Sequence, residues 1–150
     1  MTLRDEQINI RPATASDLSA VTEIEGEITG LAKPDYWKDL FERYGRNPRD
    51  GHFLVADHQG KVQGFIIGEV RAWEFGSAPC GWIFAINVRN NVRLGGVGAS
   101  LFQASCEIFR KSGMNKVRTM LARDANLVMS FFRSQGMMAG PFVELEMDLD

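Results

Sequence analysis

The sequence predicts an α/β (α+β) domain of three layers, in which helices cover both faces of a mixed, mostly antiparallel sheet. Two long segments, Val62–Arg71 and Cys80–Val88, carry bulky apolar residues at alternate and at adjacent positions, which indicates strands buried on both faces. Segments with apolar residues at helical spacing precede and follow them. Since the chain has 150 residues, we expect one domain over residues 1–150.

Composition excludes several classes of partner. Apolar residues make up 45% of the chain and charged residues 24%, as in ordinary soluble globular proteins. The net charge of −2 gives no electrostatic reason to expect nucleic acid or an anionic membrane as a partner. No apolar run approaches the length of a membrane span, and the first residues lack the apolar core of a secretion signal. We therefore expect a cytoplasmic protein.

Cysteine and histidine do not indicate a metal site. Cys80 and Cys106 lack metal-type spacing, and we expect both to stay reduced. His52 and His58 flank one expected strand without clusters of Cys or acidic residues around them. We interpret both histidines as surface residues and expect no metal.

The first third of the chain predicts a strand followed by two helices. Ile8–Arg11 is a short strand that Pro12 ends. Ser16 can cap a first helix, and a second helix begins at Pro34 or Asp35. Aromatic residues recur at helical intervals on the second helix and predict a stripe that faces the core: Tyr36, Trp37, Phe41 and Tyr44.

The middle of the chain predicts consecutive antiparallel strands. His52–Asp57 and Val62–Arg71 are separated by HQGK, which favours a tight hairpin with Gly60 at positive φ. A connection rich in turn residues, Ala72–Pro79, leads to the strand Cys80–Val88.

The last third returns to alternating helices and strands. A helix is expected at Gly98–Ser112, with Gly113 as its C-terminal cap, and a strand follows at Lys116–Ala122. The next helix is capped by Asp124 or Asn126 and ended by Gly136. A final strand, Phe142–Leu149, has alternating apolar and acidic residues.

A glycine-rich turn joins the strand Cys80–Val88 to the helix behind it. Arg93, Gly96 and Gly98 are spaced R-x-x-G-x-G, and glycines let the backbone approach a ligand closely. A helix start presents unpaired N–H groups and the positive end of the dipole, so the turn predicts a phosphate or pyrophosphate site. The P-loop pattern is excluded because no Lys-Ser or Lys-Thr follows Gly98, and the third glycine of the dinucleotide fingerprint is missing.

The element order and two motifs resemble the GNAT N-acetyltransferase superfamily across nearly the whole chain. VRNNVRLGGVGASLFQAS is similar to the main motif of that superfamily, and NLVMSFFRSQGM is similar to its fourth-helix motif. The resemblance implies a GNAT-like domain that transfers an acetyl group from acetyl-CoA directly to a primary amine. The acceptor stays open between a peptide N-terminus, a lysine, a polyamine and a small amine or antibiotic.

The resemblance also implies a coenzyme A site. Backbone groups of Ile86, Asn87 and Val88 would pair with the pantetheine arm, and Asn126 would contact that arm or cap a helix. The strands that end near Val88 and within Lys116–Ala122 would splay apart to admit the cosubstrate. The amides that would cradle the pyrophosphate belong to Arg93, Leu94, Gly95, Gly96, Val97, Gly98 and Ala99.

The catalytic positions depart from the family pattern. Phe132 occupies the position near the coenzyme sulfur where many members carry a tyrosine as general acid. The usual positions of a glutamate base hold Gly81-Trp82-Ile83 and Met120-Leu121, none of which ionises. We expect a slower enzyme. The alternative is a catalytically weak acyl-CoA-binding sensor or interaction module.

Glu69 is the candidate for the missing base. A symmetric hairpin that turns around Phe75-Gly76 would place Glu69 opposite Trp82, on the same face of the sheet. A carboxylate there could act through one water. The alternative is that Glu69 is solvated or paired with Arg71.

The last expected strand of the chain suggests how two copies could associate. The strand Phe142–Leu149 has no room for a longer hairpin, and a strand left at an edge invites pairing with another chain. We therefore predict a homodimer through this region.

Overall fold

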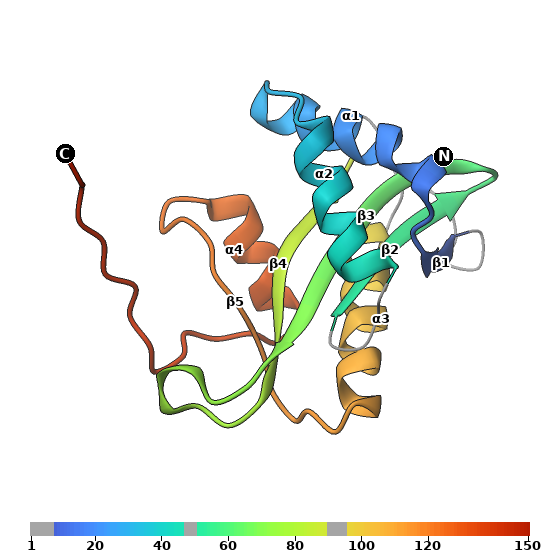
Figure 1. Ribbon diagram of the computed structural model, residues 1–150. Helices are drawn as coiled ribbons and strands as arrows, with labels where there is room; N and C mark the ends of the chain where they lie inside the picture. Colours follow the sequence, from blue (N-terminus) through green and yellow to red (C-terminus); the bar gives the residue numbers. More distant parts are fainter. Residues whose placement is uncertain (1–7, 47–50, 90–95) are drawn as a thin grey trace. The chain divides into compact units, whose positions relative to one another are not determined.

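The computed structural model describes residues 8–46, 51–89 and 96–150. The chain divides into two compact units, one that runs to Met120 and one that comprises Leu121–Asp150. The first unit holds the sheet and three of the helices, and the second holds the helix α4, Asn126–Ser134 (Figure 1).

The first unit is built on a five-stranded sheet in the order β1-β2-β3-β4-β5. All neighbouring strands are antiparallel except β4 and β5, which are parallel. The strands are β1 Asn9–Pro12, β2 Gly51–His58, β3 Lys61–Arg71, β4 Cys80–Val88 and β5 Val117–Thr119.

Helices cover both faces of this sheet. The helices α1, Leu18–Thr29, and α2, Pro34–Leu40, lie on one face, and α3, Val97–Lys111, lies on the other (Figure 1). The three-layer fold class and its mixed, mostly antiparallel sheet are thereby confirmed.

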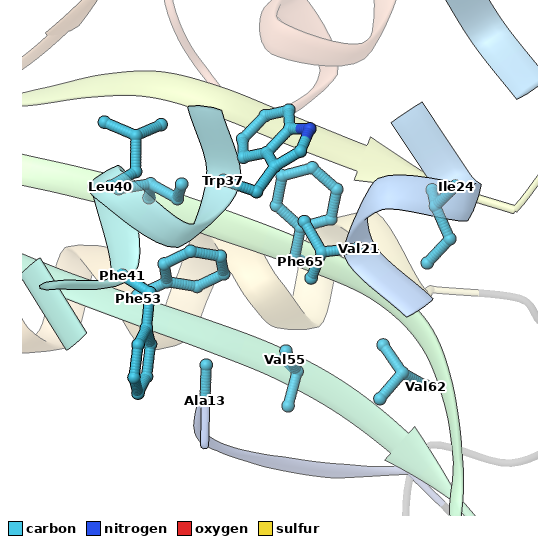
Figure 2. Close-up of a cluster of buried hydrophobic side chains, with 11 residues drawn as sticks. Ala13, Val21, Ile24, Trp37, Leu40, Phe41, Phe53, Val55, Val62 and Phe65 are labelled. Atoms are coloured by element: carbon cyan, nitrogen blue, oxygen red, sulfur yellow. The ribbon is translucent and has the colours of Figure 1, made fainter. Parts of the chain in front are cut away.

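The layer between the sheet and the first two helices is an apolar core. Alternate residues of β2 and β3 point toward α1 and α2, where Trp37 packs edge-on against Phe65 with ring centroids 5.1 Å apart (Figure 2). Phe53 and Phe65 also lie within ring contact, at 6.0 Å between centroids. Because these side chains come from elements distant in sequence, their packing fixes the helix pair on the sheet.

On the opposite face, glycines let α3 approach closely. A Cβ atom at Gly81 would lie 2.5 Å from the ring of Phe109, and one at Gly68 would lie 2.9 Å from the same ring. These two strand positions therefore have no room for a side chain under α3.

Thr14 and Asp17 form the helix start, not the expected Ser16. The Asp17 carboxylate accepts a hydrogen bond from the Thr14 N–H at 2.7 Å, and Arg11 donates to it at 2.7 Å. Ser16 lies inside the 3₁₀ turn Ala15–Asp17 that precedes α1. Burial opposes ionisation of Asp17, but the hydrogen bonds from Arg11 and Thr14 outweigh it and lower the pKa of this carboxyl.

Most element boundaries agree with the sequence to within two residues. The hairpin between β2 and β3 turns at Gln59 and Gly60, which both have positive φ (53° and 83°), as a two-residue type I′ turn requires. The second helix begins at Pro34, and Gly113 follows α3 with φ 85°. These expectations are confirmed.

Three predictions about elements are wrong. The strand expected at Lys116–Ala122 is only Val117–Thr119, and α4 follows Ala125 without a side-chain cap from Asp124 or Asn126. The final strand Phe142–Leu149 is not formed, and its residues are exposed. An alternating pattern defines two faces of an extended segment, but it does not supply the neighbouring strand whose N–H and C=O groups would complete a ladder.

No helix in the described part of the chain is both long enough and apolar enough to cross a bilayer.

Candidate active site

The pairing between β4 and β5 ends after Ile83 and Thr119, and we call this place the fork. The two strands pair over only three positions, the last two being Trp82 with Arg118 and Ile83 with Thr119. The Thr119 hydroxyl donates to the Ile83 carbonyl at 2.7 Å and closes the base of the fork. Because β5 ends at Thr119, its last paired residue, the expected splay of these two strands stays a prediction.

Beyond the fork, β4 continues as a strand with one paired edge. Ile86, Asn87 and Val88 pair with Ile66, Phe65 and Gly64 of β3. Within the described residues, no strand pairs with the other edge of this part of β4. That edge has the backbone groups that a pantetheine arm would need, at the three predicted positions.

The start of α3 fits an anion. Gly96 precedes the helix with φ 84°, which favours glycine, and the first helical hydrogen bond runs from the Ser100 N–H to the Gly96 carbonyl at 2.8 Å. The amides of Val97, Gly98 and Ala99 therefore have no acceptor within the helix. Arg93, Leu94 and Gly95 lie outside the described residues.

Glu69 lies opposite Trp82 in the β3–β4 pairing, as the symmetric hairpin predicts. One carboxylate oxygen accepts from the Tyr44 hydroxyl at 2.8 Å, and the other accepts from Arg71 Nε at 3.0 Å. The Glu69 side chain is 21% exposed. The pairing with Arg71 that we considered as an alternative is thus present together with the predicted register.

A π-helical turn brings Tyr44 to this carboxylate. The turn Phe41–Gly45 follows α2 directly, and the Arg46 N–H donates to the Phe41 carbonyl five residues back at 3.2 Å. Such turns are rare in proteins and occur often at functional sites. Gly51 makes room for the tyrosine, since a Cβ there would lie 2.5 Å from the ring of Tyr44.

The surroundings of the Tyr44 phenol keep it protonated. Burial raises the pKa of Tyr44, and the hydrogen bond to Glu69 raises it further. The ring also packs against Phe84 of β4, with centroids 5.2 Å apart. Tyr44 therefore holds the Glu69 carboxylate as a neutral hydrogen-bond donor.

Arg71 fills the space over Trp82. Its guanidinium carbon lies 4.8 Å from the centroid of the Trp82 ring, while its Nε donates to Glu69. Arg118, the partner of Trp82 on β5, donates to the Ser77 hydroxyl at 2.6 Å. The cluster beside the fork thus combines a carboxylate, a phenol, an indole and a guanidinium, which we call the Glu69 cluster (Tyr44, Glu69, Arg71 and Trp82).

Two further predicted site residues belong to the second unit. Asn126 is the first residue of α4, and Phe132 lies near its end. Phe132 is buried and contacts Phe131 with ring centroids 5.3 Å apart. Their roles toward the coenzyme stay predictions.

The contribution of Tyr44 was missed at the sequence level. Its helical spacing with Trp37 and Phe41 predicted a core-facing residue, and Trp37 and Phe41 are indeed buried. Tyr44 is partly buried and packs against the same core, and the π-helical turn after α2 also lets its hydroxyl reach Glu69 near the end of β3. The only sequence signal was a small residue, Gly51, at the start of the facing strand.

Comparison with known proteins agrees with this arrangement. The model of the acetyltransferase (GNAT) family matches residues 18–137. No curated protein matches the chain at a significant level. The fold defines a GNAT-type acyltransferase scaffold, and the chain belongs to the acetyltransferase (GNAT) family.

Solved structures share the whole fold at low sequence identity. The aminoglycoside N-acetyltransferase AAC(6′)-Iy in complex with CoA superposes with a TM-score of 0.81 at 16% identity, over 94% of this chain and 94% of that one. The aminoglycoside 6′-N-acetyltransferase AAC(6′)-IG from Acinetobacter haemolyticus gives 0.77 at 17% identity, over 95% and 99%. A transcriptional regulator from Bacillus halodurans gives 0.80 at 16% identity, also over 95% and 99%.

Proposed function

We propose that this protein transfers the acetyl group of acetyl-CoA to a primary amine. The observation that carries the proposal is the fork, where the pairing of β4 with β5 ends one residue after Trp82, the partner of Glu69. The unpaired edge of β4 and the free amides at the start of α3 support a pantetheine arm and a pyrophosphate, respectively. Family membership supports acetyl transfer as the reaction.

In the proposed reaction, the acceptor amine attacks the carbonyl carbon of the thioester. A C–N bond forms, the C–S bond breaks, and the electron pair leaves with the sulfur. Glu69 accepts the proton that the amine nitrogen loses, directly or through one water. Tyr44 keeps the carboxylate oriented by donating to one oxygen, and so acts as a positioning residue.

The presence of Phe132 at the position of the usual tyrosine supports a lower turnover rate. A phenyl ring has no proton to give to the leaving thiolate, and the loss of a general acid costs about 10²–10⁴-fold. Holding the amine against the thioester can supply about 7–11 kcal/mol, which exceeds that loss. A thioester is already activated, so positioning by the fork and one base is sufficient for measurable turnover.

The test is the acetylation of an amine panel by the purified chain. Acetyl-CoA binding is measured separately by calorimetry, and turnover is measured by release of the free thiol. We expect Gly98→Val to weaken acetyl-CoA binding by at least about tenfold in a folded protein, because a branched side chain would stand where the pyrophosphate approaches the backbone.

Glu69→Gln tests the base. This substitution keeps the shape of the side chain, and we expect kcat to fall by about tenfold or more while acetyl-CoA affinity holds. Glu107→Gln on α3 is the matched control, since it also removes a carboxylate paired with an arginine. Wild-type kcat and an unaltered pH profile in Glu69→Gln would remove Glu69 from the mechanism. Acetyl-CoA binding without turnover on any amine would instead favour the sensor or interaction module.

We also propose that the protein forms a homodimer through its C-terminal segment, Val143–Asp150. Leu145 and Met147, on the apolar side of this extended segment, are 89% and 79% exposed. No strand pairing is present in the segment, so its backbone groups are available to the same segment of a second copy.

A further inference from the structure

Arg71 occupies a position inside the Glu69 cluster that has the features of a binding site for a cation. The guanidinium lies over the face of Trp82, 4.8 Å from the ring centroid, and its Nε lies 3.0 Å from a Glu69 oxygen. An aromatic face beside a carboxylate is the usual environment of an alkylammonium group.

The rest of the cluster completes this environment without Arg71. The Tyr44 hydroxyl holds the second Glu69 oxygen, and the Tyr44 ring packs on Phe84. If the guanidinium moved away, the Trp82 face and one carboxylate oxygen would become available together. A carboxylate still held by Tyr44 would keep the orientation it has now.

Arg71 itself is weakly held. It is the last residue of β3, and its side chain is 34% exposed. Among the described residues, Nε is the only guanidinium nitrogen with a hydrogen-bond acceptor. Ion pairs and cation–π contacts near the surface each shift an equilibrium by about two- to fivefold. The pair of Arg71 with Glu69 is partly exposed, at 34% and 21%, so the long arginine side chain can leave at a small cost.

The site lies where an acceptor amine is needed. Trp82 is paired with Arg118 one residue before the fork, and Glu69 is its neighbour on β3. An ammonium bound between Trp82 and Glu69 would therefore sit at the entrance of the fork and beside the proposed base.

We propose that Arg71 is an internal cation that occupies the acceptor site, and that the ammonium group of the acceptor displaces it. The acceptor class is accordingly an alkylammonium, such as a lysine side chain or an aliphatic amine, and not an uncharged aromatic amine. Arg71 is a specificity-determining residue, because an acceptor binds only to the fraction of molecules whose site it has left. This inference rests on the proposed acetyl transfer.

The test compares Arg71→Gln, Arg71→Lys and Arg110→Gln. Arg110 also pairs with a glutamate, Glu107 at 3.3 Å, on the exposed side of α3, so its substitution removes the same charge away from the site. We expect Arg71→Gln to lower the KM for butylammonium by about fivefold. Arg71→Lys should lower it less, because the lysine keeps a competing cation but loses the stacked guanidinium, and Arg110→Gln should stay near wild type. An unchanged or raised KM in Arg71→Gln would overturn the proposal.

A binding measurement separates this inference from the proposed function. Titration of the wild-type protein with butylammonium should shift the NMR signals of the Trp82 indole N–H and the Arg71 Nε–H, and uncharged 1-butanol should leave both unchanged. Such shifts without acetylation of any amine would refute the acetyltransferase function and leave the cation site standing. Acetylation of butylammonium without any shift at Arg71 would refute the displacement and leave the enzyme standing.

Discussion

The imidazole of His52 hydrogen-bonds the hydroxyl of Ser105 between the sheet and α3, with His52 Nε2 2.5 Å from Ser105 Oγ. The two residues are separated by 53 positions in the chain, and both are buried. Phe109 packs edge-on against the same imidazole, at 5.0 Å between ring centroids. Burial lowers the pKa of His52 to about 4, so the folded protein keeps this histidine neutral where an exposed histidine is charged.

Stability is therefore predicted to depend on pH through His52. Above pH 6.5, the ordinary pKa of histidine, the residue is neutral in both states and its contribution is constant. Between pH 6.5 and about 4, the unfolded chain binds a proton that the folded chain does not. The free energy of unfolding should fall by about 1.4 kcal/mol per pH unit in this window. Urea unfolding measured at several pH values checks the slope.

His52→Gln is the control for this prediction. Glutamine retains polar atoms near the Ser105 hydroxyl but does not titrate, so the loss of stability between pH 6.5 and 4 should become shallower. An equally steep loss in the variant would assign the acid sensitivity to other groups, such as Asp17. In the wild type, the NMR signal of the His52 ring should show no protonation until the pH approaches 4.

Two glycines should respond in opposite directions to the same substitution. At Gly81 an added Cβ would lie 2.5 Å from the Phe109 ring, and we expect Gly81→Ala to destabilise the protein by about 1–3 kcal/mol because α3 must move. Gly26 lies inside α1, and a Cβ there would meet Ala32 at an ordinary 3.8 Å. Gly26→Ala should stabilise by about 0.5–1 kcal/mol. Equal effects in thermal unfolding would contradict the close packing of α3.

The pairing of Glu69 with Trp82 could be predicted from sequence because it depends only on the symmetry of one hairpin. The symmetric register holds from Arg71–Cys80 to Gly68–Ile83. A β-bulge follows, between Ile67 and Gly68. Had the bulge lain nearer the turn, Glu69 would have pointed to the other face of the sheet.

The environment of His52 could not be predicted in the same way, and the surface position expected for it is wrong. The strand pattern around His52 gives no sign that it is buried. Gly68 on the neighbouring strand and Ser105 on α3 create its site, since a Cβ at Gly68 would lie 2.9 Å from the His52 ring. Contacts of this kind depend on tertiary structure, and a local pattern does not contain them.

Tyr44→Phe is predicted to separate orientation from chemistry at the candidate base. The variant keeps the ring contact with Phe84 and removes the 2.8 Å hydrogen bond to Glu69. We expect stability to fall by about 0.5–1.5 kcal/mol, the usual net value of one hydrogen bond. The kcat should fall because the Glu69 carboxylate loses the donor that orients it, while the affinity for acetyl-CoA stays constant.

The exposed Tyr36 supplies the control for Tyr44. Tyr36→Phe removes the hydroxyl of an exposed tyrosine on the neighbouring helix α2 and should leave both kcat and its pH profile unchanged. If Tyr44→Phe lowers stability but keeps the wild-type kcat, the phenol supports the fold and does not position the base.

The C-terminal segment Val143–Asp150 has exposed apolar residues and no strand partner within the described residues. Val143 and Leu145 are 77% and 89% exposed, and the segment contains no strand pairing. Removal of Val143–Asp150 should therefore change the melting temperature little, and it should convert the proposed dimer into a monomer in light scattering. Leu145→Lys should have the same effect, because a charge on the apolar side opposes pairing between copies.

Glu146→Gln, which changes the net charge by the same amount on the acidic side, should leave the dimer intact. A wild-type protein that stays monomeric at high micromolar concentration would refute the dimer, and equal dissociation in both point variants would show that net charge and not the apolar side controls assembly.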